Sequence, residues 1–264
     1  MLAIRPDQRR DDRPVPLRPP DVRGAFEVHL TVGPGAAEAL AAWAAGHGQG
    51  HGHDDDHGPR LKFTHILLDR GASPSQPMLT LRADGTLAEA AAVTARVGAR
   101  LGRAGFTVLR AKIEATPWAE GVPVSDEDAV SHGAGRYFEH HVKLLLPAPA
   151  PTPSNVPGAD PARLAELTEL AVRHGAHLSR NPRRVRADGR REWFVTQRCR
   201  LVGLDTAGRR LAELLRDLAA DGREITSVER EFVVVDSDGT LDAGWITEHG
   251  HTPGPYGCGE VEPI

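Results

Sequence analysis

The sequence predicts an α+β fold in which one βαββαβ unit occurs twice in tandem. Four polar landmarks recur in the same order in the two halves. They are an FE-x-H segment, a later histidine, a Thr-x-Arg step and a closing glutamate: residues 26–29, His65, 80–82 and Glu114, then residues 138–141, His177, 196–198 and Glu231. Landmarks repeated in order indicate a duplicated domain, and two copies favour two lobes over a solenoid.

The composition is that of a globular protein and excludes several classes. The chain has 264 residues, 40% hydrophobic and 26% charged, enough for one or two domains. A net charge of −4 gives no general attraction to nucleic acid or to an anionic membrane. Two cysteines form neither a disulfide framework nor a zinc ligand set, and they fit a reducing, cytoplasmic location. Residues 1–24, rich in Arg, Asp and Pro, are expected to be a disordered leader.

The first lobe, residues 25–116, shows the order β-α-β-β-α-β. Alternating or continuous apolar runs predict strands at 26–32, 61–68, 78–82 and 106–115, and helical spacing predicts helices at 36–45 and 86–105. Thr86 is the expected helix N-cap, and Asp84-Gly85 is read as a turn. A His/Asp-rich loop at 46–58 is expected to be solvated, with weak metal binding as the alternative. This order is the ferredoxin-like split βαβ arrangement.

The second lobe, residues 137–246, repeats that order after a linker at 117–136. Strands are predicted at 137–146, around His177, at 192–201 and at 225–235, and helices at 161–174 and 206–220. Residues 180–191 are read as a basic turn, which could contact an RNA or phosphate backbone. Trp245 is expected to pack as a plug, and residues 247–264 are expected to form an irregular tail.

Strand parity places polar side chains on the sheet face that lacks helices. A strand alternates its side chains between faces, so one face of each lobe collects the polar set. In the first lobe these are Glu27, His29, Thr31, Thr80, Arg82, Lys112 and Glu114; in the second they are Glu139, His141, Lys143, Thr196, Arg198, Glu229 and Glu231. We therefore expect two antiparallel sheets that enclose a charged, two-lobed cleft. The alternative is a set of solvated cross-strand ion pairs.

Two short motifs carry family resemblances. His29-x-Thr31 resembles the His-x-Thr/Ser motif of the two-histidine phosphoesterases, which also have two pseudo-symmetric lobes. This resemblance implies that His29 is a general acid or base and that Thr31 holds phosphate; the aligned place in the second lobe reads His141-Val142-Lys143. The strand Glu139-x-His141-x-Lys143 is also similar to the Glu-x-Glu-x-Lys strand of CYTH-type triphosphate tunnels, which enclose a charged tunnel.

A metal site is an alternative use of the same residues. Imidazole and carboxylate groups suit zinc, iron, nickel or manganese, and each lobe offers two histidines and a glutamate. On this interpretation His65 and His177 are metal ligands, and a divalent metal is the candidate cofactor.

The sequence thus predicts a hydrolase-like enzyme that binds phosphate: a phosphoesterase or phosphotransferase acting on an anionic, phosphorylated or nucleotide-like small molecule. His29 and His141 would exchange protons, and Glu114 and Glu231 would orient them or hold a metal. The predicted contacts to anionic oxygens are Thr31, Arg82, Lys112, Lys143 and Arg198. A non-catalytic protein that binds metal or a small ligand, and a structural oligomerisation module, are the alternatives. No membrane partner is expected.

Overall fold

The computed structural model describes residues 21–47, 59–147 and 161–246. In the first half the elements are β1 (Arg23–Val32), η1 (Pro34–Ala36), α1 (Ala37–His47), β2 (Lys62–Leu68), β3 (Ser75–Thr86), α2 (Leu87–Arg103), β4 (Val108–Ala115) and α3 (Asp126–His132). In the second half they are β5 (Tyr137–Leu146), α4 (Pro161–Arg173), β6 (Ala176–Val185), β7 (Arg191–Arg200), α5 (Leu204–Ala220), β8 (Ile225–Asp236) and η2 (Gly239–Asp242). The predicted duplication is therefore present as two ferredoxin-like units.

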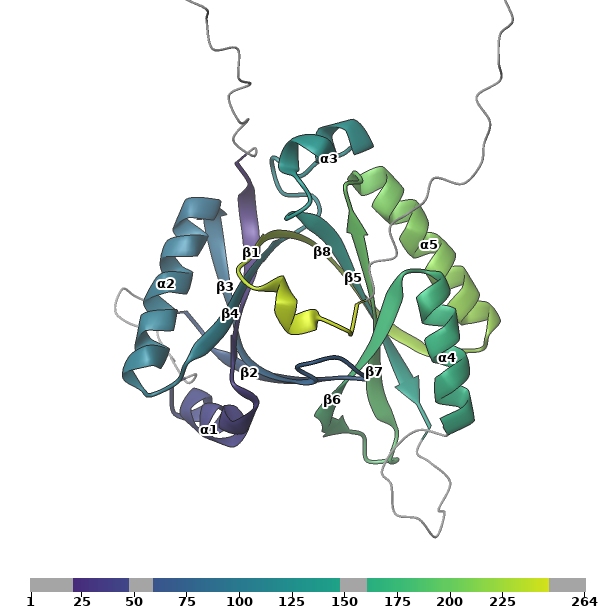
Figure 1. The fold of residues 1–264 in the computed structure, drawn as a ribbon, viewed down its shortest axis with the longest axis horizontal. Coiled ribbons are helices and arrows are strands. Elements are labelled where there is room, and N and C mark those ends of the chain that lie inside the picture. The colour runs from purple at the N-terminus through teal and green to yellow at the C-terminus, as the bar shows by residue number, and fades with distance from the viewer. Residues whose placement is uncertain (1–20, 48–58, 148–160, 247–264) are drawn as a thin grey trace, which may run out of the picture.

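The two sheets join into one closed barrel with the order β1-β3-β2-β6-β7-β5-β8-β4 (Figure 1). The seams are antiparallel: β2 pairs with β6, and β4 pairs with β8. The expected two-lobed cleft is thus corrected to a barrel interior, because free sheet edges pair with each other when a barrel closes. Each seam joins a strand to its own counterpart, so a pseudo-twofold axis passes through both seams. The two halves consequently run in opposite directions along the barrel.

The helices lie outside the ring of strands and cover its apolar face (Figure 1). In α2, the buried residues Ala90, Thr94, Val97 and Leu101 recur at helical spacing. Thr86 caps this helix as predicted: its side chain accepts from the Glu89 backbone N–H, and the Glu89 carboxylate accepts from the Thr86 backbone N–H. A second buried cluster, which includes residues of α4 and α5, packs on the sheet of the second half.

Three elements differ from the sequence predictions. Strand β3 does not turn at Asp84-Gly85 but continues to Thr86, because its pairing with β1 continues there and Gly85 takes φ 117°. Strand β6 extends to Val185, so the expected basic turn at 180–191 is in large part strand. The linker contains α3, which has a capping box between Ser125 and Asp128.

The chain after β8 closes one end of the barrel. Figure 1 shows η2, in yellow, lying within the ring of strands. Trp245 is 4% exposed, and its indole N–H donates to the Leu178 carbonyl at 2.8 Å. We call residues 237–246 the plug.

Several predictions fall outside the described residues or concern the membrane. The leader up to residue 20, most of the His/Asp-rich loop and the tail from 247 lie outside the described ranges. Among the helices within those ranges, none has the length and apolar character needed to cross a bilayer.

Candidate functional site

The polar faces of both halves line a single cavity of about 340 Å³ inside the barrel. The predicted site residues that line it are His29, Thr31, His65, Lys112, Glu114, His141, Lys143, Arg198 and Glu231. Arg82 and His177 are not part of this lining. The Arg82 side chain is 86% exposed and pairs with Glu27 at 3.6 Å. A volume of this size is at the lower end of the range for small-molecule sites.

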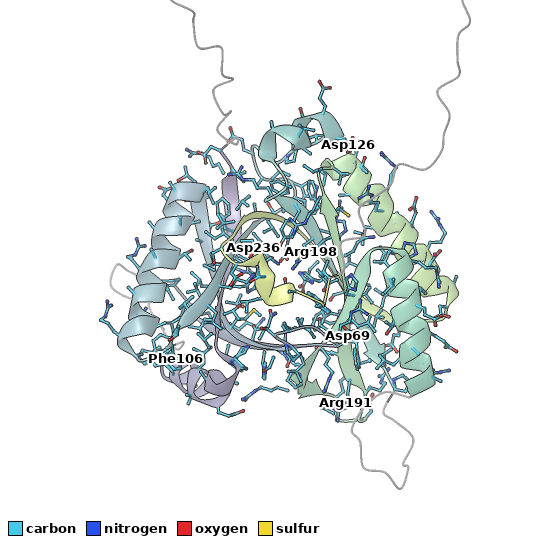
Figure 2. All side chains as sticks on the ribbon, viewed as in Figure 1. Asp69, Phe106, Asp126, Arg191, Arg198 and Asp236 are labelled. Atoms are coloured by element: carbon cyan, nitrogen blue, oxygen red, sulfur yellow. The ribbon has the colours of Figure 1, made fainter. Side chains whose placement is uncertain are left out.

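A continuous chain of ion pairs runs from the plug to the centre of the cavity. Asp242 of the plug lies 3.0 Å from Arg110 and 2.6 Å from Arg198. Arg110 also binds Asp236, and Arg198 binds Glu139. Figure 2 shows Arg198 and Asp236 on the inner side of the ring of strands, whereas Phe106 and Asp126 lie outside it. Buried charges require partners of opposite sign, and acidic and basic side chains alternate along this series of ion pairs.

Lys112 joins the two halves at the centre of this chain. Its ammonium lies 2.5 Å from Glu114 of its own strand and 2.5 Å from Glu139 of β5. Burial disfavours the charged ammonium, but the two carboxylates outweigh it and raise the pKa of Lys112 above its ordinary value. Lys112 is therefore a fixed internal cation.

The two histidines occupy equivalent positions and have equivalent partners. His29 Nδ1 lies 2.9 Å from Thr80 Oγ1, and His141 Nδ1 lies 3.0 Å from Thr196 Oγ1. His29 Nε2 lies 3.0 Å from Glu114. Burial lowers the pKa of His29, but Glu114 and, to a smaller extent, Glu231 raise it, and the net shift is upward. In both halves the histidine therefore has a threonine hydroxyl next to Nδ1 and a glutamate carboxylate next to Nε2.

His141 has two carboxylates close to its Nε2. Its Nε2 lies 3.2 Å from Glu139 and 3.3 Å from Glu231. Burial opposes the imidazolium, but hydrogen bonds and attraction from both carboxylates raise the pKa of His141 to about 10. His141 is therefore protonated at neutral pH.

Glu231 differs from Glu114 and Glu139, the other two glutamates around Lys112 and His141. The side chains of Glu114 and Glu139 are 1% and 2% exposed and each contacts at least two cationic groups, whereas the Glu231 side chain is 18% exposed. Among the described residues, its ion-pair partner is His141. Burial, followed by repulsion from Glu114, raises the pKa of Glu231 to about 7, against the attraction of His141. Glu231 can gain or lose a proton near neutral pH in contact with the cavity.

The lining is balanced in charge apart from the histidines. It carries seven basic and seven acidic side chains: Lys62, Arg110, Lys112, Lys143, Arg183, Arg184 and Arg198, with Glu27, Glu114, Glu139, Glu192, Glu229, Glu231 and Asp242. Protonated His141 adds one positive charge to this set, and Asp236, which binds Arg110 from outside the lining, adds one negative charge. Lys62 and Glu229 are exposed, and they lie with Lys143 at the end of the barrel away from the plug. We call this end the mouth.

A possible metal triad overlaps the ion chain. Glu114, Glu139 and His141 offer ligand atoms within 4.8 Å of one another. The Lys112 ammonium already bridges the two carboxylates, so a metal ion would have to displace it. The triad therefore fits an ammonium better than a divalent ion.

The structure does not bring the two predicted metal ligands to one site. His65 lies in the cavity lining with its Nε2 3.0 Å from Ser75 Oγ. His177 is buried behind the plug, where its Nδ1 accepts from Arg70 at 2.6 Å.

Sequence reasoning missed three members of the ion chain: Arg110, Asp236 and Asp242. Parity along β4 places Arg110 on the same face as Lys112, so this residue was detectable. Asp242 follows the last strand in an Asp/Gly-rich turn, and no local pattern shows that this turn folds back into the barrel.

Comparisons with known proteins give limited information. No protein-family model matches the chain, and no curated protein matches it significantly. Similar solved structures include a protein provisionally named a chlorite dismutase, with a TM-score of 0.24 and 13% identity over 85% of this chain and 100% of that one. A mutant chlorite dismutase of Candidatus Nitrospira defluvii gives 0.25 and 13% over 83% and 93%. A protein of Lactobacillus acidophilus, provisionally named a monooxygenase, gives 0.24 and 11% over 82% and 94%. Scores this low transfer no activity.

The predicted phosphoesterase or phosphotransferase function is wrong, and so are the hydrolase and phosphate-binding assignments. The interior of the barrel shows why. Two of the cations expected to hold phosphate are neutralised internally: Lys112 by Glu114 and Glu139, and Arg198 by Glu139 and Asp242. Arg82 points into solvent.

Proposed function

We propose that the barrel is an acid–base enzyme that transfers a proton to and from carbon in a small carbonyl compound. The observation that carries this proposal is the position of Glu231. It combines contact with the cavity and an ion-pair partner in His141, whereas Glu114 and Glu139 are enclosed by fixed cations. A carboxylate with a pKa of about 7 is suited to take a proton and return it at neutral pH.

The surrounding groups support the same chemistry. Glu231 would accept the proton from a carbon next to the carbonyl, and the electron pair would move onto the carbonyl oxygen. Glu139 continues to hold the His141 Nε2–H when Glu231 is neutral, and the positive charge of the imidazolium then acts on that oxygen without competition from Glu231. A buried cation stabilises such an oxyanion more strongly than water does. Thr196 fixes the other ring nitrogen of His141 and so sets the ring orientation.

Exchange of carbon-bound hydrogen in deuterated water tests this proposal without knowledge of the overall reaction. A panel of small neutral ketones and 2-oxo acids would be incubated with the protein and followed by proton NMR. We expect exchange with the wild-type protein and a loss of at least about 10²-fold in rate for Glu231→Gln. Glu229→Gln, on the same strand at the exposed mouth, serves as the control and should exchange normally. Equal rates for wild type and Glu231→Gln, or no exchange on any compound, would contradict the proposal.

A further inference from the structure

We infer that the cavity binds organic carboxylates and that Lys143, at the mouth, is the residue that holds the carboxylate group. This inference rests on the proposed function for the position of the reacting carbon, next to Glu231. It names the chemical class of the substrate and the residue that selects it.

The closed end of the barrel shows how such a carboxylate is held. The pseudo-twofold axis relates the cross-strand pair Thr31 and Arg110 to the pair Lys143 and Ser227. Each pair contains one cation, Arg110 at the plug and Lys143 at the mouth. Arg110 binds the carboxylate of Asp242, which the plug carries into the barrel. No equivalent segment enters the mouth among the described residues, so the place of that carboxylate is open to a ligand.

Lys143 has surroundings that fit this role. Its side chain is half-buried and lines the cavity, with the ammonium 5.4 Å from the centre of the Phe194 ring. Within the described ranges, no carboxylate lies at ion-pair distance from it, in contrast to Arg110, Lys112 and Arg198. A half-buried cation gains most from an anionic partner that is itself removed from water. Phe194 and Phe63 offer apolar surface to the body of the ligand.

The spacing along β5 orients the ligand. Lys143 and His141 are two residues apart on the same face of the strand, which corresponds to about 7 Å. A carboxylate on Lys143 therefore leaves the rest of a small molecule directed towards His141 and Glu231. His141 favours the same ligand, because its positive charge attracts an anion in the same sense as that of Lys143.

Isothermal titration calorimetry with matched acids and esters tests the inference. The probes are pyruvate, 2-oxobutyrate and phenylpyruvate, each compared with its methyl ester, which keeps the shape and removes the charge. We expect at least one acid to bind at least tenfold more tightly than its ester. Lys143→Met should lose this preference, and Lys143→Arg should retain it. Lys62→Met, which removes another cation at the mouth, should change affinity less than threefold.

The outcomes separate this inference from the proposed function. Binding should persist in Glu231→Gln, because that carboxyl acts on the reacting carbon. Acids that bind through Lys143 without any hydrogen exchange would overturn the proposed function and leave the inference standing. Equal affinity for acids and esters, an unchanged preference in Lys143→Met, or no binding by any acid would overturn the inference, whatever exchange the neutral ketones show.

Discussion

At the scale of single residues, the interior shows how neighbours set the behaviour of chemically identical groups. Glu114 and Glu231 are equivalent in the duplication, but Glu114 contacts Lys112 and His29 while Glu231 contacts His141. Burial alone would raise the pKa of Glu114, but attraction from Lys112 and then from His29 holds it below its ordinary value. For Glu231, burial and then repulsion from Glu114 raise the pKa. The replacement of Lys112 by Glu229 at the equivalent strand position accounts for this divergence.

The raised pKa of Glu231 predicts a specific dependence of stability on pH. The folded protein holds this proton more tightly than the unfolded chain, so the stabilisation is complete below the unfolded value of 4.5 and is lost as pH rises through about 7. Glu231→Gln imitates the protonated acid at every pH. Relative to wild type, its free energy of unfolding should therefore increase by about 3 kcal/mol between pH 5 and pH 9. Urea unfolding at both pH values measures this. A constant difference between the two proteins would show that Glu231 titrates normally.

At the scale of elements, the plug acts as an internal ligand of the barrel. Asp242 is 3% exposed and accepts from Gln76 at 3.0 Å in addition to binding two arginines. The Trp245 indole closes over the same end. The plug thus contributes charge compensation that the strands do not provide alone.

Removal of the Asp242 charge should destabilise the protein. Asp242→Asn leaves Arg110 and Arg198 buried with one carboxylate fewer, which typically costs about 3–5 kcal/mol. Chemical unfolding monitored by tryptophan fluorescence measures the loss. Asp238→Asn is the matched control in the same segment; it keeps a cap for Thr240 and should change stability by less than about 0.5 kcal/mol. If both variants unfold at the same denaturant concentration, the plug charge contributes nothing to stability.

At the scale of the whole molecule, the two units depend on each other. The barrel closes through main-chain pairing of β2 with β6 and of β4 with β8, and Lys112 of one unit neutralises Glu139 of the other. A separated unit would expose two strand edges and unpaired charges on its inner face.

We therefore expect residues 21–116 and 117–246 to be unable to fold as separate monomers. Each chain should show weak circular dichroism or self-association, and refolding them together should give a 1:1 complex with the spectrum of the intact protein. Size-exclusion chromatography with light scattering determines the stoichiometry. A stable, cooperatively unfolding monomer of either half would show that the seams are dispensable.

Local patterns could predict the elements and the inner faces. Alternation along residues 26–32 and 137–146 correctly separates His29 and His141 from their apolar neighbours, because successive side chains of any strand point to opposite faces of the sheet. Thr86 was predictable as a cap because its partner Glu89 is three residues away. Barrel closure was not predictable in this way. The β2–β6 seam consists of main-chain pairing at Leu67 and Leu68, which needs no particular side chains. The neutralisation of Lys112 by Glu139 depends on closure at the other seam, between β4 and β8, so the sequence analysis assigned Lys112 the wrong role.

The pseudo-twofold axis also has a consequence for stoichiometry. A tandem duplication usually provides two independent binding sites, one for each copy. Here the axis passes through the seams, and the polar faces of both copies line the same cavity. Each copy supplies half of one site, and a ligand that occupies the cavity uses both halves at once. Titration should therefore saturate at one molecule per chain, with no cooperativity between the copies, because the two copies share this one cavity.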